Sequence, residues 1–257
     1  MATTSRVTIQ ETYELPSRGK FEGVPEKITL RAMSLSDEKQ RLATPGFRGI
    51  VDLINNCTIK PEGFDANKLS QFDLDFAMLK LRIISHGSNY NVEVTCPHCQ
   101  KLIQTAINLD DLQCTSVDDD FSSKFEIGPL PISGDVLTIK LLTFEDRENM
   151  ESEAKRILTK FPNYKGDPED VLTYIYMIKE VNGEVLPYTK LKSYIETMPA
   201  NDSIYVDQMY TDASGNYGLD TLITFECPNC GETFVRNMPM NSEFFRPRFD
   251  IAKRSNV

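Results

Sequence analysis

Apolar and polar residues alternate in two stretches near the N-terminus, Val7–Leu15 and Lys27–Met33, and this period-two pattern predicts strands. Short helices are expected over 36–42, with Ser34 or Ser36 as the N-cap, and over 47–56. A longer helix is expected over about 66–85. Its apolar residues form one row at spacings of three and four plus a second row, which predicts burial on two sides. Asp65 is the candidate cap, and Gly87 is the expected residue after the C-terminus.

The second half of the chain mixes both periodicities. Two strands are expected at 124–128 and 135–142, and helices are expected to begin at Thr143, with Asp146 at the capping-box spacing, and at Asp167-Pro168. Asn182-Gly183 predicts a tight type I′-like turn. Two further short helices are expected over 188–197 and 202–211.

Two copies of one short pattern stand out, Cys96-Pro97-His98-Cys99 and Cys227-Pro228-Asn229-Cys230. Alternating strand-like residues precede and follow each copy, so each is expected at the tip of a β-hairpin. A Cys-x-x-Cys at a hairpin tip is typical of a zinc knuckle. Two knuckles together supply four thiolates for one closed tetrahedral Zn²⁺ site, with Zn–S distances near ~2.3 Å. We therefore expect Cys96, Cys99, Cys227 and Cys230 to hold one structural zinc ion.

The spacing of the two pairs is unusual. Residues 100–226 separate them, whereas a compact zinc ribbon has roughly 15–20 residues there. Two unrelated turns, a lost metal or a redox pair are the alternatives. A catalytic redox pair needs a helix N-terminus to lower its thiol pKa, and here strands flank the cysteines. Four Cys ligands also leave no open position for a catalytic water. His98 could replace a Cys, but an exposed turn residue is the simpler interpretation.

Composition limits the class of function. The formal net charge is −10, which argues against a general nucleic-acid or anionic-membrane surface. The start of the sequence lacks the apolar region of a secretory signal, and no apolar run approaches the ~18 residues of a membrane helix. We expect the chain to be made in a reducing cytosol, where paired cysteines are more often metal ligands than disulfides. Cys57 is expected in the core, and Cys114 has no recognisable partner.

The C-terminal tail combines Phe244, Phe245 and Phe249 with Arg246, Arg248, Lys253 and Arg254. Its aromatic rings either dock on the chain's own core or insert into a partner protein, as aromatic and arginine anchors do at interfaces.

These patterns predict an α+β fold in which a zinc-ribbon-like pair of Cys-x-x-Cys hairpins clasps a helical N-terminal half and an inserted mixed α/β region. The expected divisions are N-terminal strands and helices (1–87), a split zinc ribbon (88–110 plus 219–240), an inserted region (111–218) and an aromatic-basic tail (241–257).

The order of several stretches resembles the baseplate hub subunits and hub assembly proteins of T-even-like contractile-tailed bacteriophages. These stretches are 14–19 followed by 28–34, the helix of 76–87 leading into the first knuckle, and 225–231 with the later Phe244-Phe245-Arg-Pro. The resemblance implies a non-enzymatic structural or assembly component near the centre of the tail baseplate, assembled in the host cytoplasm and located in the virion. Its partners would be other baseplate and tail proteins in a hetero-oligomeric assembly, with no membrane involved.

The second hypothesis is a zinc-ribbon protein that binds nucleic acid in transcription or replication. Such ribbons usually crowd Lys and Arg around their knuckles. Here Lys101 and Arg236 stand against Glu93, Glu226 and Glu232, so the local charge does not favour DNA. An enzyme is the third hypothesis. The sequence has no nucleophile elbow, phosphate-binding glycine loop or HExxH motif to support it.

Overall fold

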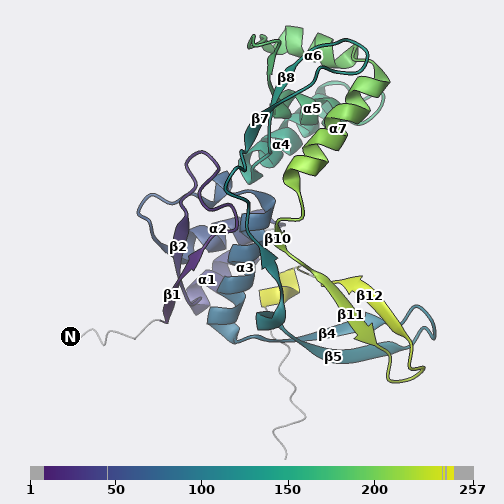
Figure 1. Cartoon of the computed structure of the whole chain (residues 1–257). Helices are drawn as coiled ribbons and strands as arrows, with labels where there is room; N and C mark the ends of the chain where they lie inside the picture. The colour runs from purple at the N-terminus through teal and green to yellow at the C-terminus, as the bar shows by residue number, and fades with distance from the viewer. Residues whose placement is uncertain (1–8, 45, 239, 241, 246–257) are drawn as a thin grey trace, which may run out of the picture.

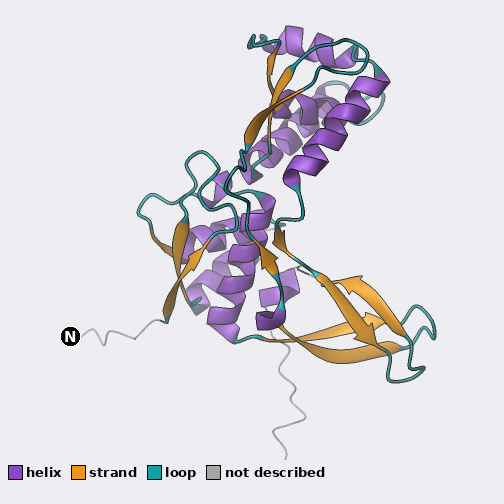
Figure 2. Ribbon diagram, viewed as in Figure 1, coloured by secondary structure: helices purple, strands orange, loops and turns teal. Residues whose placement is uncertain are grey.

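The structure is a computed structural model that describes residues 9–44, 46–238, 240 and 242–245. In this part of the chain, seven α-helices and five small antiparallel sheets form three parts (Figures 1 and 2). A helical N-terminal core lies in the middle, and a lobe of helices and strands lies on one side of it. A narrow arm of four strands projects in another direction. No helix among these residues is both long and apolar enough to span a bilayer.

The N-terminal core packs three helices beside a three-stranded sheet. The helices are α1 (Leu35–Ala43), α2 (Arg48–Cys57) and α3 (Gln71–His86), and the sheet has the order β1 (Gln10–Glu14), β2 (Lys27–Arg31), β3 (Thr58–Lys60). As the two apolar rows predict, α3 is buried on more than one side, through Leu74, Phe76, Met78, Leu79 and Leu81. The prediction missed β3, which is only three residues long.

The long helix begins later than the sequence pattern predicted. Asp65 caps only a short 3₁₀ turn, η1 (Ala66–Lys68), and α3 starts after Ser70, whose hydroxyl accepts a hydrogen bond from the backbone N–H of Asp73. The chain between the two helices is extended because its backbone bonds elsewhere: Phe144 N–H donates to the Leu69 carbonyl at 3.0 Å, and Ser70 forms an isolated bridge with Thr143. A long-range contact therefore overrides the local helical pattern.

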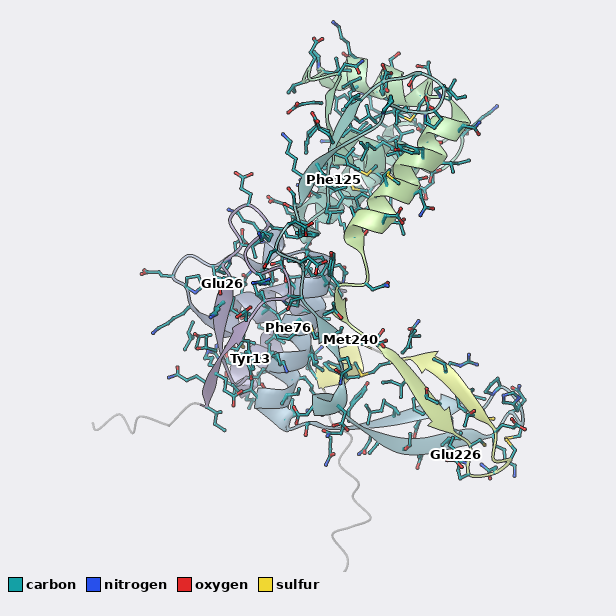
Figure 3. The ribbon with its side chains drawn as sticks, viewed as in Figure 1. Tyr13, Glu26, Phe76, Phe125, Glu226 and Met240 are labelled. Atoms are coloured by element: carbon teal, nitrogen blue, oxygen red, sulfur yellow. The ribbon has the colours of Figure 1, made fainter. Side chains whose placement is uncertain are left out.

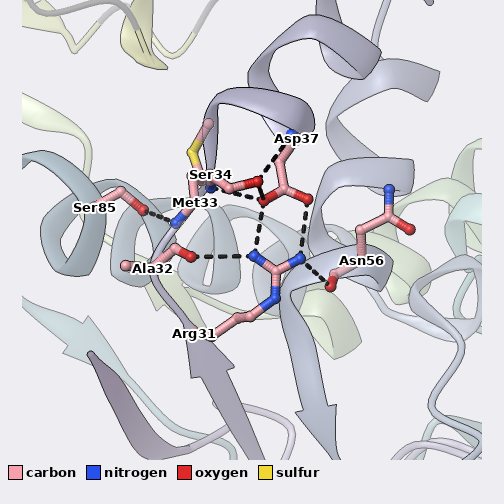
Figure 4. Close-up of polar contacts among 7 residues, drawn as sticks. All are labelled: Arg31, Ala32, Met33, Ser34, Asp37, Asn56 and Ser85. Atoms are coloured by element: carbon pink, nitrogen blue, oxygen red, sulfur yellow. Dashed lines mark hydrogen bonds and ion pairs between the residues drawn. The ribbon is translucent and has the colours of Figure 1, made fainter. Parts of the chain in front are cut away.

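Helix α1 is fixed to the sheet through its N-terminus (Figure 4). Ser34 and Asp37 form the capping box, which settles the choice between Ser34 and Ser36 as the cap. The Arg31 guanidinium of β2 donates to both Asp37 carboxylate oxygens, at 2.7 and 2.9 Å, and to the Asn56 carbonyl at the end of α2. This bidentate bond holds the pKa of Asp37 well below its usual range, although burial opposes the shift. One charge pair thus joins β2, α1 and α2.

The arm consists of two hairpins, β4 (Asn89–Thr95) with β5 (Leu102–Asn108), and β11 (Leu222–Glu226) with β12 (Thr233–Asn237). Both predicted hairpins are confirmed. Each hairpin turns its apolar face toward the other, so that Val92 and Ile103 are buried in the same core cluster as Phe225 and Phe234. In the described chain no strand pairing links the two hairpins, so side chains alone hold these faces together.

Two short strands close the base of the long connection between the hairpins. Strand β6 (Cys114–Thr115) pairs with β10 (Gly218–Leu219), and Asp220 N–H extends the pairing to the Gln113 carbonyl. Gly218 has φ +87°, and a Cβ there would lie 2.4 Å from Phe72 Cβ of α3. Only glycine permits this close approach of β10 to α3. Because β6 pairs with β10, both strands that connect to the long insertion lie close to α3. The short 3₁₀ turn η2 (Leu109–Asp111) precedes β6.

The lobe between these strands has its own hydrophobic core, centred on residues such as Leu137, Ile139, Leu172, Met177 and Val206. We call β7 to α7 (124–214) the inserted lobe. Its sheet has the order β7-β8-β9. Its elements are β7 (Lys124–Ile127), β8 (Leu137–Lys140), α4 (Phe144–Lys160), α5 (Pro168–Met177), β9 (Ile178–Val181), α6 (Tyr188–Glu196) and α7 (Ala200–Ser214).

Local signals in the inserted lobe were predicted well. Thr143 and Asp146 form a capping box, and Asp167 caps α5 with Pro168 in its first turn. Asn182 and Gly183 both have positive φ, at 52° and 78°, as a type I′ turn requires.

The first aromatic residues of the C-terminal tail dock on the chain's own core. Phe244 and Phe245 belong to η3 (Ser242–Phe245) and are 0% and 1% exposed. Phe244 packs edge-on against Tyr90 at the base of β4, with ring centroids 5.1 Å apart. Arg82, itself only 1% exposed, donates to the Phe244 carbonyl at 2.9 Å and to the carbonyls of Gly87 and Asn89. Phe249 and the basic residues Arg246, Arg248, Lys253 and Arg254 lie outside the described residues.

Candidate metal centre

The two knuckles are built alike, although they lie far apart in sequence. In the first, Cys96 N–H donates to the Lys101 carbonyl and Gln100 N–H donates to the Cys96 carbonyl, both at 3.0 Å. In the second, Cys227 N–H donates to the Glu232 carbonyl at 2.9 Å and Gly231 N–H to the Cys227 carbonyl at 2.8 Å. The same two bonds therefore shape both turns and direct both cysteines of each pair toward one point.

Both turns end in a left-handed residue. Gly231 has φ +75°, which costs glycine nothing, and the equivalent Gln100 has φ +59°. The Gln100 side chain partly compensates by donating from Nε2 to the Pro97 carbonyl at 2.9 Å. The Gly in the second knuckle is thus a local signal of the turn, whereas the first knuckle adopts the same turn without it.

The structure brings the four predicted cysteines together. Their Sγ atoms all lie within 4.8 Å of one another. The Sγ atoms of Cys96 and Cys230 are 3.8 Å apart, and those of Cys99 and Cys227 are 3.6 Å apart. These distances cross between the hairpins. Cys96 and Cys227 are 0% exposed, Cys99 is half-buried and Cys230 is exposed.

The spacing of the sulfurs fits a tetrahedral metal site. Ligands at ~2.3 Å from a zinc ion at the centre of a tetrahedron lie about 3.8 Å from each other. The two cross-hairpin distances of 3.8 and 3.6 Å match that edge length. A disulfide would require an S–S distance of about 2.05 Å. The donor set of four sulfurs suits zinc, and four such ligands would close the coordination sphere of the ion and leave no position for a substrate.

The backbone of the second knuckle favours a thiolate. Burial raises the pKa of the Cys227 thiol, but hydrogen bonds from the backbone N–H groups of Asn229 and Cys230 outweigh this effect and bring the pKa to about 6. For Cys230, a hydrogen bond from the Glu232 N–H lowers the pKa of the thiol. Burial and the neighbouring sulfurs outweigh this bond and raise the pKa to about 12. Four sulfurs this close cannot all be anionic without a cation between them.

The remaining candidates lie away from this centre. His98 is exposed in its turn, as expected. Cys57 is fully buried in the N-terminal core, where burial raises the pKa of its thiol to about 12, and this agrees with the predicted core role. Cys114 is exposed in β6. His86 lies in the last turn of α3, where a charged imidazole would complement the helix dipole, but burial and nearby Arg82 lower its pKa.

Sequence reasoning missed Arg82. It lies among apolar residues in the C-terminal half of α3, and no sequence pattern indicates that its guanidinium bonds three backbone carbonyls at the base of the arm.

Comparison with known proteins adds the family. The sequence matches a protein-family model described as "T4 bacteriophage base plate protein" over residues 7–246. The chain belongs to this family. No curated protein and no solved structure matches it. The match covers both knuckles, the inserted lobe and Phe244-Phe245, and it confirms the resemblance at the level of a phage baseplate protein. As a base plate family member, the chain is a structural component of a phage tail.

Proposed function

We propose that this base plate family member is a non-enzymatic structural or assembly component of the hub region of a phage tail baseplate. One zinc ion, held by Cys96, Cys99, Cys227 and Cys230, would fix the arm as a rigid surface for contacts with other proteins. The observation that carries the role of the metal is the convergence of four sulfurs, from hairpins 128 residues apart, within 4.8 Å of one another.

The construction of the arm supports a role for a metal. Isolated two-stranded hairpins are marginally stable in water, and here two such hairpins face one another without shared backbone hydrogen bonds in the described residues. A zinc ion at the tip would join the ends of both. The metal would therefore shape a surface and take no part in a reaction, which agrees with a closed ligand set.

We propose the domain divisions expected from the sequence: 1–87, the split ribbon of 88–110 with 219–240, the inserted region 111–218 and the tail 241–257. The separate hydrophobic core of the inserted lobe supports the third division. The pairing of β6 with β10, which closes both ends of this region, supports it as well.

The proposed partners are other baseplate and tail proteins in a hetero-oligomeric assembly, built in the host cytoplasm and retained in the virion. The charged residues beside the sulfurs favour protein over nucleic acid, because Glu93, Glu226 and Glu232 outnumber Lys101 and Arg236.

Two measurements test this function. Mass spectrometry of purified phage particles and of baseplate assembly intermediates should detect the chain together with other baseplate proteins. Its absence from both would refute the structural role. Elemental analysis of the purified chain should find about one zinc per chain. Binding to duplex or single-stranded DNA that survives physiological salt would favour the nucleic-acid hypothesis instead.

A further inference from the structure

A groove of about 410 Å³ runs along one side of the arm, between the two hairpins. Strand β5 supplies one wall through residues 105–108, and β11 supplies the other through residues 223–226. Asp111 and Leu112 line it where the arm joins the core. No part of the metal centre lines this groove.

The lining residues show that the groove follows strand edges. Successive side chains of a strand point to opposite faces, so a groove over one face would be lined by every second residue. Here four consecutive residues line it on each side, from Thr105 to Asn108 and from Ile223 to Glu226. The groove therefore runs beside both backbones. Among the described residues β5 pairs only with β4, and β11 only with β12, so each has one free edge of N–H and C=O groups.

Free strand edges are a template for another strand. Strand β5 runs away from the first knuckle and β11 runs toward the second, so the two edges point in opposite directions. An extended segment between them would run antiparallel to one and parallel to the other. Its backbone could bond either edge, and alternate side chains would meet the buried Ile107 and Phe225 and the half-buried Leu112.

The rim of the groove is acidic. Asp111 stands at the base, and Glu226 lies on the arm beside the second knuckle (Figure 3). Asp111 accepts a hydrogen bond from Asn108 Nδ2 at 3.0 Å, and neither carboxylate has an ion-pair partner in the described chain. Both carboxylates are therefore available to a cation that arrives with a partner.

We infer that this groove receives an extended, positively charged segment of another baseplate protein, which adds as a β-strand to the free edges of β5 and β11. The inference rests on the proposed function for the identity of the partner. Main-chain hydrogen bonds supply affinity in such additions, and Lys or Arg side chains at the ends would pair with Asp111 and Glu226.

The test uses a synthetic peptide of alternating Lys and Val, capped at both ends, titrated into zinc-loaded full-length chain and followed by ¹H–¹⁵N NMR. Shifts should concentrate on 105–112 and 222–226. The peptide with every backbone nitrogen methylated should not bind, because it keeps the side chains but loses the N–H donors on both of its edges. The peptide with Glu for Lys should also bind poorly. Shifts located elsewhere, or equal binding of the methylated peptide, would overturn strand addition.

Charge variants provide the matched control. The pair Asp111→Asn with Glu226→Gln should weaken binding of the Lys/Val peptide by up to about 30-fold, because two surface ion pairs contribute up to ~1 kcal/mol each and 1.4 kcal/mol is tenfold in affinity. The pair Glu62→Gln with Glu184→Gln makes the same change in net charge on exposed sites away from the groove and should leave affinity unchanged. Equal effects of the two pairs would refute the acidic rim as a recognition element. Detection of the chain in phage particles is independent of peptide binding, so failure of either idea can be told from failure of the other.

Discussion

Replacing Cys227 by Ser tests whether the two hairpins form one metal-clamped arm. Cys227 is fully buried, and its Sγ lies 3.6 Å from that of Cys99 on the other hairpin. The hydroxyl of Ser is a poor zinc ligand at neutral pH, whereas its size differs little from the thiol. The substitution therefore removes one metal bond and leaves the packing of the knuckle almost unchanged. We expect loss of zinc and separation of the hairpin tips.

The magnitude follows from the loop that the metal closes. A cross-link over 128 residues restricts the unfolded chain by about 5 kcal/mol in the chain-entropy treatment used for disulfides. The metal bonds themselves contribute on the order of 10 kcal/mol to folding in small zinc domains. Either figure is comparable with the whole stability of a domain, roughly 5–15 kcal/mol. The arm has few other contacts across its halves, so we expect it to open locally while the two hydrophobic cores persist.

Hydrogen exchange and elemental analysis measure this outcome. In Cys227→Ser, amides of β4, β5, β11 and β12 should lose protection, α3 and the inserted lobe should keep theirs, and zinc should fall well below one per chain. Cys114→Ser is the matched control, because Cys114 is exposed and outside the sulfur cluster. A Cys227→Ser chain with unchanged zinc content and unchanged protection of the arm would refute the shared site.

Three further predictions concern the N-terminal core and its junctions. The buried Asp73 carboxyl has its pKa raised to about 6, mainly by burial, so its native form holds the proton more tightly than the unfolded form. This stabilisation is complete below the unfolded pKa of about 3.9 and is lost as pH rises through 6. In urea unfolding at pH 4 and pH 7, the free energy of unfolding of the wild type should fall by about 2 kcal/mol more than that of Asp73→Asn, and equal losses would contradict this. Gly218→Ala should lower the free energy of unfolding by more than ~2 kcal/mol in the same assay, because the added Cβ would clash with Phe72. Gly134→Ala is the control: Gly134 also has a positive φ, +74°, but open space around it, so this change should cost about 1 kcal/mol. Equal costs would show that the close approach to Phe72 adds nothing. Arg82→Met should lower the free energy of unfolding by about 3 kcal/mol or more by leaving three carbonyls without their donor, and a neutral result would show that solvent reaches them.

The sequence predicts those features that residues settle with their immediate neighbours. The capping boxes at Ser34 and Thr143 and the turn at Asn182-Gly183 follow from short-range hydrogen bonding and backbone sterics. The convergence of the four sulfurs was also predictable, because a knuckle binds a metal only with a second knuckle and the chain contains two.

Features that depend on distant segments could not be predicted. The late start of α3 depends on Leu69 and Ser70 meeting the chain at 143–144, and the two-residue strand β6 exists only because Gly218 brings β10 beside it. The positions of Phe244 and Phe245 depend on Arg82, which bonds the Phe244 carbonyl as well as the nearby carbonyls of Gly87 and Asn89. None of these contacts leaves a local pattern in the sequence.

The arm is closed at both ends by long-range contacts, and this links the metal to the groove. At the base, Arg82 reaches Phe244 over 162 positions, and at the tip the sulfurs of Cys99 and Cys227 meet over 128. Between these points β5 and β11 share no backbone bonds in the described chain, so their separation depends on the two closures.

If zinc sets the separation of the free edges, the metal-free chain should lose the binding of the Lys/Val peptide even though no metal ligand lines the groove. We expect Cys227→Ser to weaken binding of the peptide at least as strongly as the double variant Asp111→Asn with Glu226→Gln, as measured by NMR titration. Cys114→Ser should leave the affinity unchanged. Undiminished binding by the zinc-free Cys227→Ser chain would show that packing at the base alone keeps the edges apart. The role of the metal would then be limited to the tip.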